Sequence, residues 1–263
     1  MLQIVPLKDG RTLIAAFSLA KKKSRHWVVL LTESGAEFQP GSREELKQLL
    51  GPRLAAQFNY LVINKPGLLP SGVDKQAFES SFRRNRRVHD ALTTLEAVIP
   101  RSDKICLVGY SEGAYLAPEV ALKDDRVKSV VTIGGGTRGW LKEEFSRVKG
   151  AREKSALRRQ IEKIVKNQRS TEKWNGFSYA TWHSYRADSA LKALRQIEVP
   201  VLSILGKRDR VIDLKATLRD LDSLSKKKNI RTEVFHDCGH SFVNHWSDVR
   251  RKMIEFLRSN RIN

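Results

Sequence analysis

Apolar residues along this chain gather in two kinds of segment. In the first kind they form short continuous runs that end in glycine, proline or small polar residues: WVVLLTESG, YLVINKPG, KICLVG, VKSVVTIGGG and VPVLSILG. Such runs are typical of strands that are buried on both faces of a parallel sheet. Two earlier runs, LQIVPL and TLIAAFSLA, are joined by KDGR and predict a hairpin at the start of the chain. A last strand is expected at RTEVFHDCG.

In the second kind of segment, apolar residues recur at helical spacing. Phe78, Phe82, Leu92 and Leu95 follow this spacing and predict a helical stretch over residues 76–99. Similar segments follow most of the buried runs, so that strands and helices alternate along the chain. This alternation predicts an α/β fold with a mostly parallel central sheet and helices on both of its faces.

The alternation is interrupted between residues 137 and 186. This segment contains an amphipathic helix near residues 156–168 and an aromatic stretch, KWNGFSYATWHSYR, that has no clean period. We interpret the interruption as an inserted helical cap. The expected organisation is therefore one α/β core built from residues 1–136 and 187–263, with a cap formed by residues 137–186.

The charge balance is unusual, with 49 lysines and arginines against 29 aspartates and glutamates and a formal net charge of +20. Such an excess favours an anionic substrate or partner. The basic residues are dispersed, and no aromatic residues alternate with them as in a single-strand binder, so no specific nucleic acid is expected. The richest stretch, Arg138–Arg169, is most simply a set of solvated helix faces, although it would also guide an anionic substrate.

Other features exclude several classes of protein. No apolar run approaches the roughly 20 residues that a transmembrane helix needs. The first ten residues lack the basic and apolar regions of a signal peptide, so the cytoplasm is the default location, although a signal peptide removed earlier would leave no trace. No H-x-H, H-E-x-x-H, C-x-x-C or G-x-G-x-x-G pattern occurs where a site would need it, so we expect neither a metal nor another cofactor.

The most specific chemical signal is a G-x-S-x-G pattern, Gly109-Tyr110-Ser111-Glu112-Gly113, which lies between the run KICLV and the helix-forming segment AYLAPEVAL. A serine on a tight strand-to-helix turn has a strained backbone, and the two glycines remove Cβ atoms that would collide there. The amino terminus of the following helix offers N–H groups to a developing anion. We therefore interpret Ser111 as a nucleophile; an inert serine in a glycine-rich turn is the alternative.

A nucleophilic serine needs a base that takes its proton and a group that orients this base. Asp209 comes just after the strand VPVLSILG, and His240 comes just after the last expected strand. The carboxyl ends of the strands are where open α/β sheets gather their functional residues. Asp213 and Asp237 are alternatives for the orienting carboxylate, and we favour Asp209.

The sequence at this point resembles the α/β-hydrolase superfamily over nearly its whole length. The resemblance rests on the hairpin start, the elbow GYSEGA, the cap after the sixth strand, LGKRDRVI and DCGHSF, and the elbow is similar to that of bacterial serine esterases. It implies Ser111 as nucleophile, His240 as general base and then acid, and Asp209 as the orienting carboxylate. It also implies an ester or related acyl substrate and no cofactor.

One feature departs from the pattern of this superfamily. Many members end the third strand with His-Gly, whereas this chain has Thr32-Glu33-Ser34-Gly35. An oxyanion hole needs one backbone N–H from this loop and one from the residue after the nucleophile. We assign these donors to Glu112 and to either Glu33 or Ser34. The carboxylates of both glutamates then have to point away from the oxyanion or pair with basic residues.

The substrate pocket is expected to involve aromatic side chains. The cap contributes Trp174, Phe177, Tyr179, Trp182 and Tyr185, which line the pocket or simply pack the cap against the core. We select Trp174, Tyr179 and Trp182 from this group as pocket residues.

Tyr110, beside the proposed nucleophile, completes the expected pocket. The favoured function is a serine carboxylesterase that acts on an ester of a small or medium acyl group, with no metal. Hydrolysis of an amide or peptide, as in aminopeptidases or amidases, would use the same triad. A non-catalytic protein that binds an anionic partner on a hydrolase scaffold is the alternative from another class.

Overall fold

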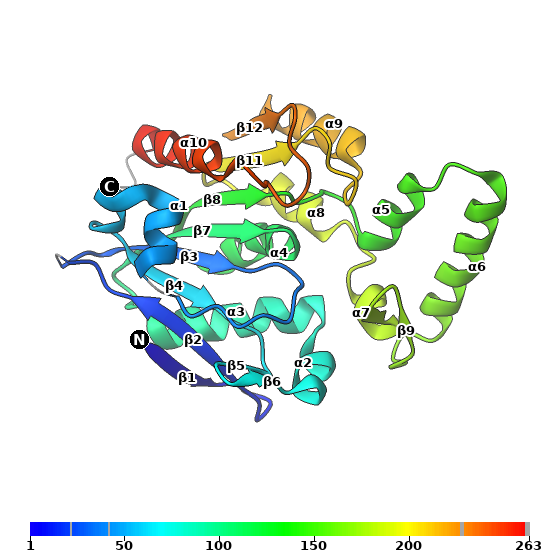
Figure 1. The fold of residues 1–263 in the computed structure, drawn as a ribbon, viewed down its shortest axis with the longest axis horizontal. Coiled ribbons are helices and arrows are strands. Elements are labelled where there is room, and N and C mark those ends of the chain that lie inside the picture. The colour runs from blue at the N-terminus through cyan, green and yellow to red at the C-terminus, as the bar shows by residue number, and fades with distance from the viewer. Residues whose placement is uncertain (22, 42, 227–228, 261–263) are drawn as a thin grey trace.

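The computed structural model describes residues 1–21, 23–41, 43–226 and 229–260. An eight-stranded sheet forms its centre, with strand order β1-β2-β4-β3-β7-β8-β11-β12 (Figure 1). The strands are β1 Leu2–Pro6, β2 Thr12–Ser18, β3 His26–Leu31, β4 Asn59–Ile63, β7 Lys104–Tyr110, β8 Val127–Ile133, β11 Val201–Gly206 and β12 Ile230–Phe235. Within the described ranges, no helix combines the length and the apolar character that crossing a bilayer requires.

The strands pair as the apolar runs predict. β2 is antiparallel to both β1 and β4, whereas the pairs from β4 through β3, β7, β8 and β11 to β12 are all parallel. The expected amino-terminal hairpin and the mostly parallel sheet are therefore confirmed.

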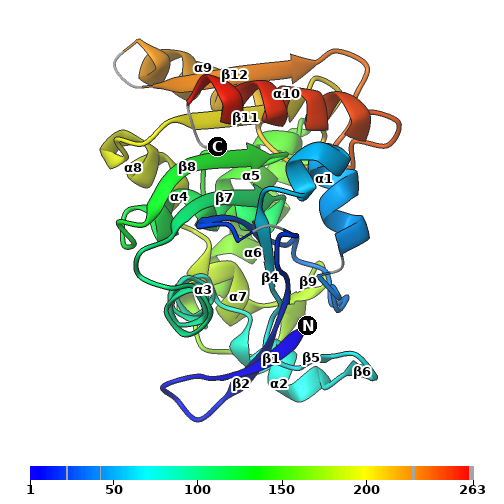
Figure 2. The same ribbon diagram turned by 90° about the vertical axis from the view of Figure 1, so that its left-hand side faces the viewer.

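Helices cover both faces of the sheet. They are α1 Arg43–Ala55, α3 Arg84–Val98, α4 Glu112–Ala121, α8 Ser189–Gln196, α9 Leu214–Ser225 and α10 Trp246–Ser259. The helices α3, α4, α8 and α9 pack on one face, and α1 and α10 pack on the other (Figure 2). Successive residues of a strand serve opposite faces, so that Leu107 packs toward α3 and α4 while Cys106 and Val108 pack toward α1 and α10.

The helical stretch expected over residues 76–99 is two helices, α2 Lys75–Ser81 and α3. The chain between them is extended at Arg83, with φ −137° and ψ 140°. Phe82 is buried at this break, where its ring lies 5.4 Å from that of Phe78 and 5.5 Å from that of Phe177. Phe82 thus obeys helical spacing although it lies between the helices, which is why the apolar pattern does not reveal the break.

The segment between β8 and α8 contains α5 Trp140–Arg147, α6 Ala151–Lys166, β9 Lys173–Trp174, β10 Phe177–Ser178 and α7 Tyr179–Ser184. We call residues 140–184, which lie within the predicted cap of residues 137–186, the insertion. It lies beyond the carboxyl ends of the parallel strands (Figure 1). The aromatic stretch without a period contains a hairpin whose turn, Asn175-Gly176, has φ 44° and 83°. A second short hairpin, β5 Leu68–Leu69 and β6 Gly72–Val73, follows β4.

Candidate active site

Ser111 lies on the turn between β7 and α4, with φ 51° and ψ −111°, a conformation that side chains rarely adopt. Both neighbouring glycines are required by close approaches to backbone. A Cβ on Gly113 would lie 2.0 Å from the carbonyl oxygen of Leu31, and a Cβ on Gly109 would lie 2.3 Å from that of Gly113. The strained turn therefore depends on the packing of α4 against β3 as well as on its own sequence.

The three residues expected to act together do lie together. The Ser111 Oγ atom is 2.9 Å from His240 Nε2, and His240 Nδ1 is 2.7 Å from Asp209 Oδ2. Because an ionised carboxylate only accepts hydrogen bonds, Nδ1 donates to Asp209, and Nε2 of the neutral ring accepts from the serine hydroxyl. This is the tautomer that a general base needs.

Asp209 is itself held by the backbone after β11. Its Oδ1 atom accepts N–H groups from Val211 at 2.7 Å and from Ile212 at 3.3 Å. The carboxylate side chain has 0% exposure, against 21% for the His240 side chain. The acid is therefore fixed in orientation while the imidazole keeps an open side toward a substrate.

The two alternative carboxylates occupy other positions. Asp213 is the N-cap of α9, where its side chain accepts the N–H of Ala216 at 3.0 Å. Asp237 is exposed, and its Oδ1 atom lies 3.5 Å from Nε2 of His245. Of the three candidates, Asp209 is the one that contacts His240.

A small cavity of about 130 Å³ opens beside Ser111 and His240. Of the expected oxyanion donors, Ser34 and Glu112 line this cavity, and Glu33 is not among its lining residues. The carboxylate of Glu112 is buried and accepts a hydrogen bond from the Tyr185 hydroxyl. Its Oε1 atom also lies 3.6 Å from Nε of Arg87. The negative charge therefore has a basic neighbour, which is one of the two arrangements that the sequence analysis expects.

Lys65 is a site-supporting residue that the sequence analysis did not single out. It is buried just past β4, and its Nζ donates to Thr32 Oγ1 at 3.1 Å and to the carbonyl oxygen of Gly35 at 2.9 Å. These bonds bracket the loop that contains Glu33 and Ser34. Burial lowers the pKa of Lys65 to about 7. The only sequence signal is a lysine placed directly after an apolar strand.

Aromatic side chains form much of the remaining wall. Trp182, one of the expected pocket residues, lines the cavity together with Tyr115, Trp140 and Phe177. The Trp140 ring stacks on Tyr185 with centroids 4.0 Å apart, which fixes its orientation. The sequence analysis did not select Trp140, because it follows a glycine-rich loop outside the aromatic stretch.

The other expected pocket residues lie away from this cavity. Trp174 packs on Trp182 with ring centroids 4.7 Å apart. Tyr179 is buried, and its hydroxyl donates to Glu172 at 2.7 Å. Tyr110 points to the opposite side of its strand end and lines a different cavity. The aromatic residues of the insertion therefore divide between lining the cavity and packing within the insertion.

Three further charged residues line the cavity, Glu143, Glu144 and Arg147, and Arg147 forms an ion pair with Glu144. The carboxylate of Glu143 accepts the backbone N–H of Asp213, and the Tyr115 hydroxyl lies 3.5 Å from its Oε1 atom. Burial raises the pKa of Glu143 to about 7. Among the described residues, no group of three or more histidines, cysteines, aspartates or glutamates could hold a metal ion.

Comparisons with known proteins identify a family and a shared fold. A model of the alpha/beta hydrolase family matches residues 34–251. An Exiguobacterium antarcticum esterase has a similar structure, with a TM-score of 0.67 and 14% identity, covering 98% of this chain and 100% of that one. A Pyrococcus furiosus esterase is also similar, with a TM-score of 0.67 and 16% sequence identity, and the match covers 98% of this chain and 90% of that one.

A peptidase has a similar fold as well. The acylaminoacyl peptidase of Pyrococcus horikoshii gives a TM-score of 0.71 at 14% identity, covering 98% of this chain and 41% of the longer peptidase. The search of curated proteins gave no match. At these identities the solved structures establish a shared fold and no more.

Proposed function

The chain belongs to the alpha/beta hydrolase family, and we propose that it is a serine carboxylesterase that cleaves esters of short acyl groups. The observation that carries this proposal is the hydrogen-bonded line from Ser111 Oγ through the His240 ring to Asp209, with distances of 2.9 and 2.7 Å. Each member has the geometry that nucleophilic catalysis requires.

In the proposed first step, Ser111 Oγ attacks the ester carbonyl carbon while its proton moves to His240 Nε2. The carbonyl oxygen becomes an oxyanion, which accepts hydrogen bonds from the backbone N–H of Glu112 and from that of Ser34. Glu112 is the first residue of α4, so the positive end of this helix adds to the stabilisation. We favour Ser34 over Glu33 because Ser34 lines the cavity.

Collapse of this intermediate breaks the bond to the alkoxy group, which takes the proton from His240 and leaves as an alcohol. The acyl group then remains on Ser111 as an ester. A water molecule gives a proton to His240 and attacks this acyl-enzyme, and a second collapse returns the proton to Ser111 and releases a carboxylic acid. Asp209 orients the ring and stabilises the imidazolium in both halves of the reaction.

The size of the cavity favours a short acyl group. Its volume of about 130 Å³ is well below the roughly 300–1,000 Å³ of sites that take drug-sized ligands. We assign residues 137–186 as a cap, because Trp140, Phe177 and Trp182 from this segment line the cavity.

A series of 4-nitrophenyl esters from acetate to octanoate tests this proposal. We expect kcat/KM to be highest for the shortest acyl groups. Asp209→Asn should lower it by about 10⁴-fold, and Ser111→Ala by about 10⁶-fold. Asp237→Asn is the matched control, since Asp237 is exposed and pairs only with His245 among the described residues. Full activity in Ser111→Ala would refute the proposal. Cleavage of 4-nitroanilides in preference to esters would identify an amidase instead.

A further inference from the structure

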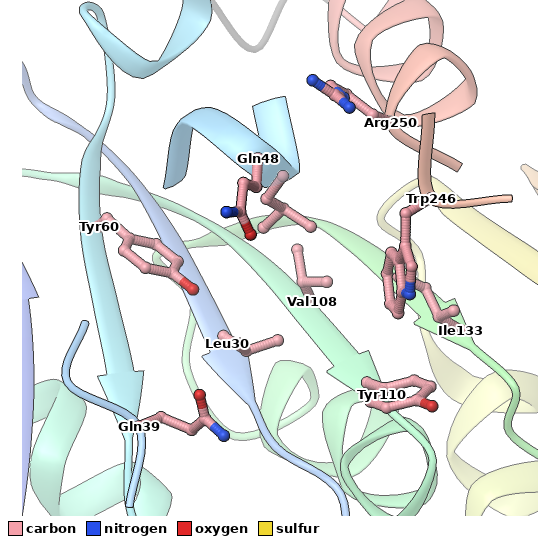
Figure 3. Close-up of a pocket in the computed structure, with 10 residues that line it drawn as sticks. Leu30, Gln39, Gln48, Tyr60, Val108, Tyr110, Ile133, Trp246 and Arg250 are labelled. Carbon is pink, nitrogen blue, oxygen red and sulfur yellow. The ribbon is translucent and has the colours of Figure 1, made fainter. Parts of the chain in front are cut away.

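A second cavity, of about 480 Å³, lies on the face of the sheet that α1 and α10 cover (Figure 3). Leu30, Val108 and Ile133 of three adjacent strands form its floor, and Leu49 of α1 and Trp246 of α10 form its walls. No residue lines both this cavity and the one beside Ser111. Its volume falls within the range of about 300–1,000 Å³ that is typical of small-molecule sites.

The opening between sheet and helices coincides with a break in α1. Gly51 within this helix has φ 76° and ψ 163°, which are not helical, and Pro52 follows it. The two halves of α1 therefore differ in direction. Leu50 and Leu54 are buried in the core beneath the helix, whereas Gln48 extends toward the cavity (Figure 3).

The chemistry of the lining is that of a site for an amphipathic anion. Arg250 of α10 is the single charged residue among the described residues that line it, and it sits at one end above the apolar floor (Figure 3). Among the side chains that the structure describes, none forms a hydrogen bond or ion pair with its guanidinium group. The other polar groups of the lining are the side-chain amides of Gln39 and Gln48, the hydroxyls of Tyr60 and Tyr110 and the indole N–H of Trp246.

We propose that this cavity binds an apolar monocarboxylate, the anion of a medium-chain fatty acid. The carboxylate accepts hydrogen bonds from the Arg250 guanidinium, which suits the planar geometry of both groups. The hydrocarbon chain lies against Leu30, Leu49 and Trp246, the apolar lining residues that are partly exposed, and displaces water from their surface.

The proposed ligand would lie close to the triad without entering it. Tyr110 lines the cavity, and its ring packs edge-to-face on Trp246 with centroids 5.5 Å apart. The same ring lies 6.3 Å from the His240 ring. Binding is nevertheless separable from hydrolysis, because Leu49 and Arg250 are absent from the lining of the cavity beside Ser111.

Calorimetric titration of the full chain with decanoate tests this inference. We expect one decanoate per chain, binding at least about tenfold weaker in Arg250→Gln, as for a lost hydrogen bond to a charged group. Leu49→Trp, which fills the cavity, is expected to abolish binding. Arg251→Gln is the matched control, because Arg251 is exposed and pairs with Asp248 and Glu255 outside the cavity.

The competing outcomes are distinct. Equal affinity in the wild type, Arg250→Gln and Leu49→Trp would place the acid elsewhere and overturn the proposal. Binding of 1-decanol as tightly as decanoate would overturn the role of Arg250. Esterase activity should be retained in the same variants, because neither Leu49 nor Arg250 lines the cavity beside Ser111. A failure of decanoate to bind would therefore not contradict the proposed reaction at Ser111.

Discussion

Ser111 is held in position by residues that take no part in chemistry themselves. Gly109 and Gly113 permit the close approaches of α4, β7 and β3, and the N–H of Ser111 donates to Ile133 of β8 at 2.9 Å. Asp209 is likewise fixed by the N–H groups of two residues that follow it. The side chains of the proposed reaction are therefore preorganised by backbone contacts.

Glu143 gives the proposed reaction a pH dependence that can be isolated. Its pKa of about 7 means that it becomes negatively charged within the cavity as the pH rises through neutrality. This charge would oppose formation of the oxyanion nearby. We expect kcat/KM of Glu143→Gln, divided by that of the wild type, to rise up to about tenfold between pH 6 and 8, the effect of about 1.4 kcal/mol.

The ratio removes contributions that both proteins share, including that of His240. Steady-state assays with 4-nitrophenyl acetate across this pH range measure it directly. A ratio that stays flat would show that ionisation of Glu143 does not reach the reacting atoms.

Which residues meet at the site could be inferred only partly from sequence. Ser111, Asp209 and His240 follow separate strands, and their chain order suggests a common site before any contact is known. The lining of the pocket carries no comparable signal, because Trp140 and Glu143 reach it through the fold of the insertion. The placement of Lys65 beneath the loop of residues 32–35 likewise depends on how β3 and β4 pair.

The short hairpin of β9 and β10 connects the insertion to the site. Its turn is Asn175-Gly176, and the next residue, Phe177, lines the cavity beside Ser111. The indole N–H of Trp182 donates to the carbonyl oxygen of Trp174 at 2.7 Å, which ties α7 to the same hairpin. A two-residue turn thus fixes two walls of the proposed acyl pocket.

Gly176→Val tests the role of this turn. Gly176 has φ 83° and no atom within 4 Å of an added Cβ, so the cost is backbone strain of about 1–2 kcal/mol. We expect the Tm to fall by about 2–4 °C for each kcal/mol, and kcat/KM to fall because Phe177 moves.

Gly10→Val is the control, because Gly10 has φ 81°, equally open surroundings and a place in the distant amino-terminal hairpin. Thermal unfolding and ester assays compare the two variants. Equal effects of both on kcat/KM would contradict a specific role of the β9–β10 turn.

The elements differ in how well their sequences predict them. The buried strands and the hairpin of β1 and β2 are clear from continuous apolar runs. The break at Phe82 is hidden because a buried aromatic residue fits both helical spacing and the cluster around Phe177. The β9–β10 hairpin does carry a local signal, since Asn-Gly favours a two-residue turn, but aromatic residues on both sides obscure it.

The molecule as a whole gathers its proposed chemistry at one edge of the sheet. The turn after β7 and the loops after β11 and β12 bring Ser111, Asp209 and His240 together, and the insertion lies beyond the same edge (Figure 1). The second cavity does not lie at this edge. It lies on the face of the sheet that α1 and α10 cover. One fold therefore contains two cavities with separate linings.

The central claim is that Ser111 is a nucleophile activated by His240. The most direct test is to treat the protein with a fluorophosphonate, which reacts with activated serines, and to read the intact mass beside that of Ser111→Ala. We predict one adduct per chain, mapped to Ser111 and absent from the variant. A wild type that takes no label, or a variant that takes as much, would contradict the account.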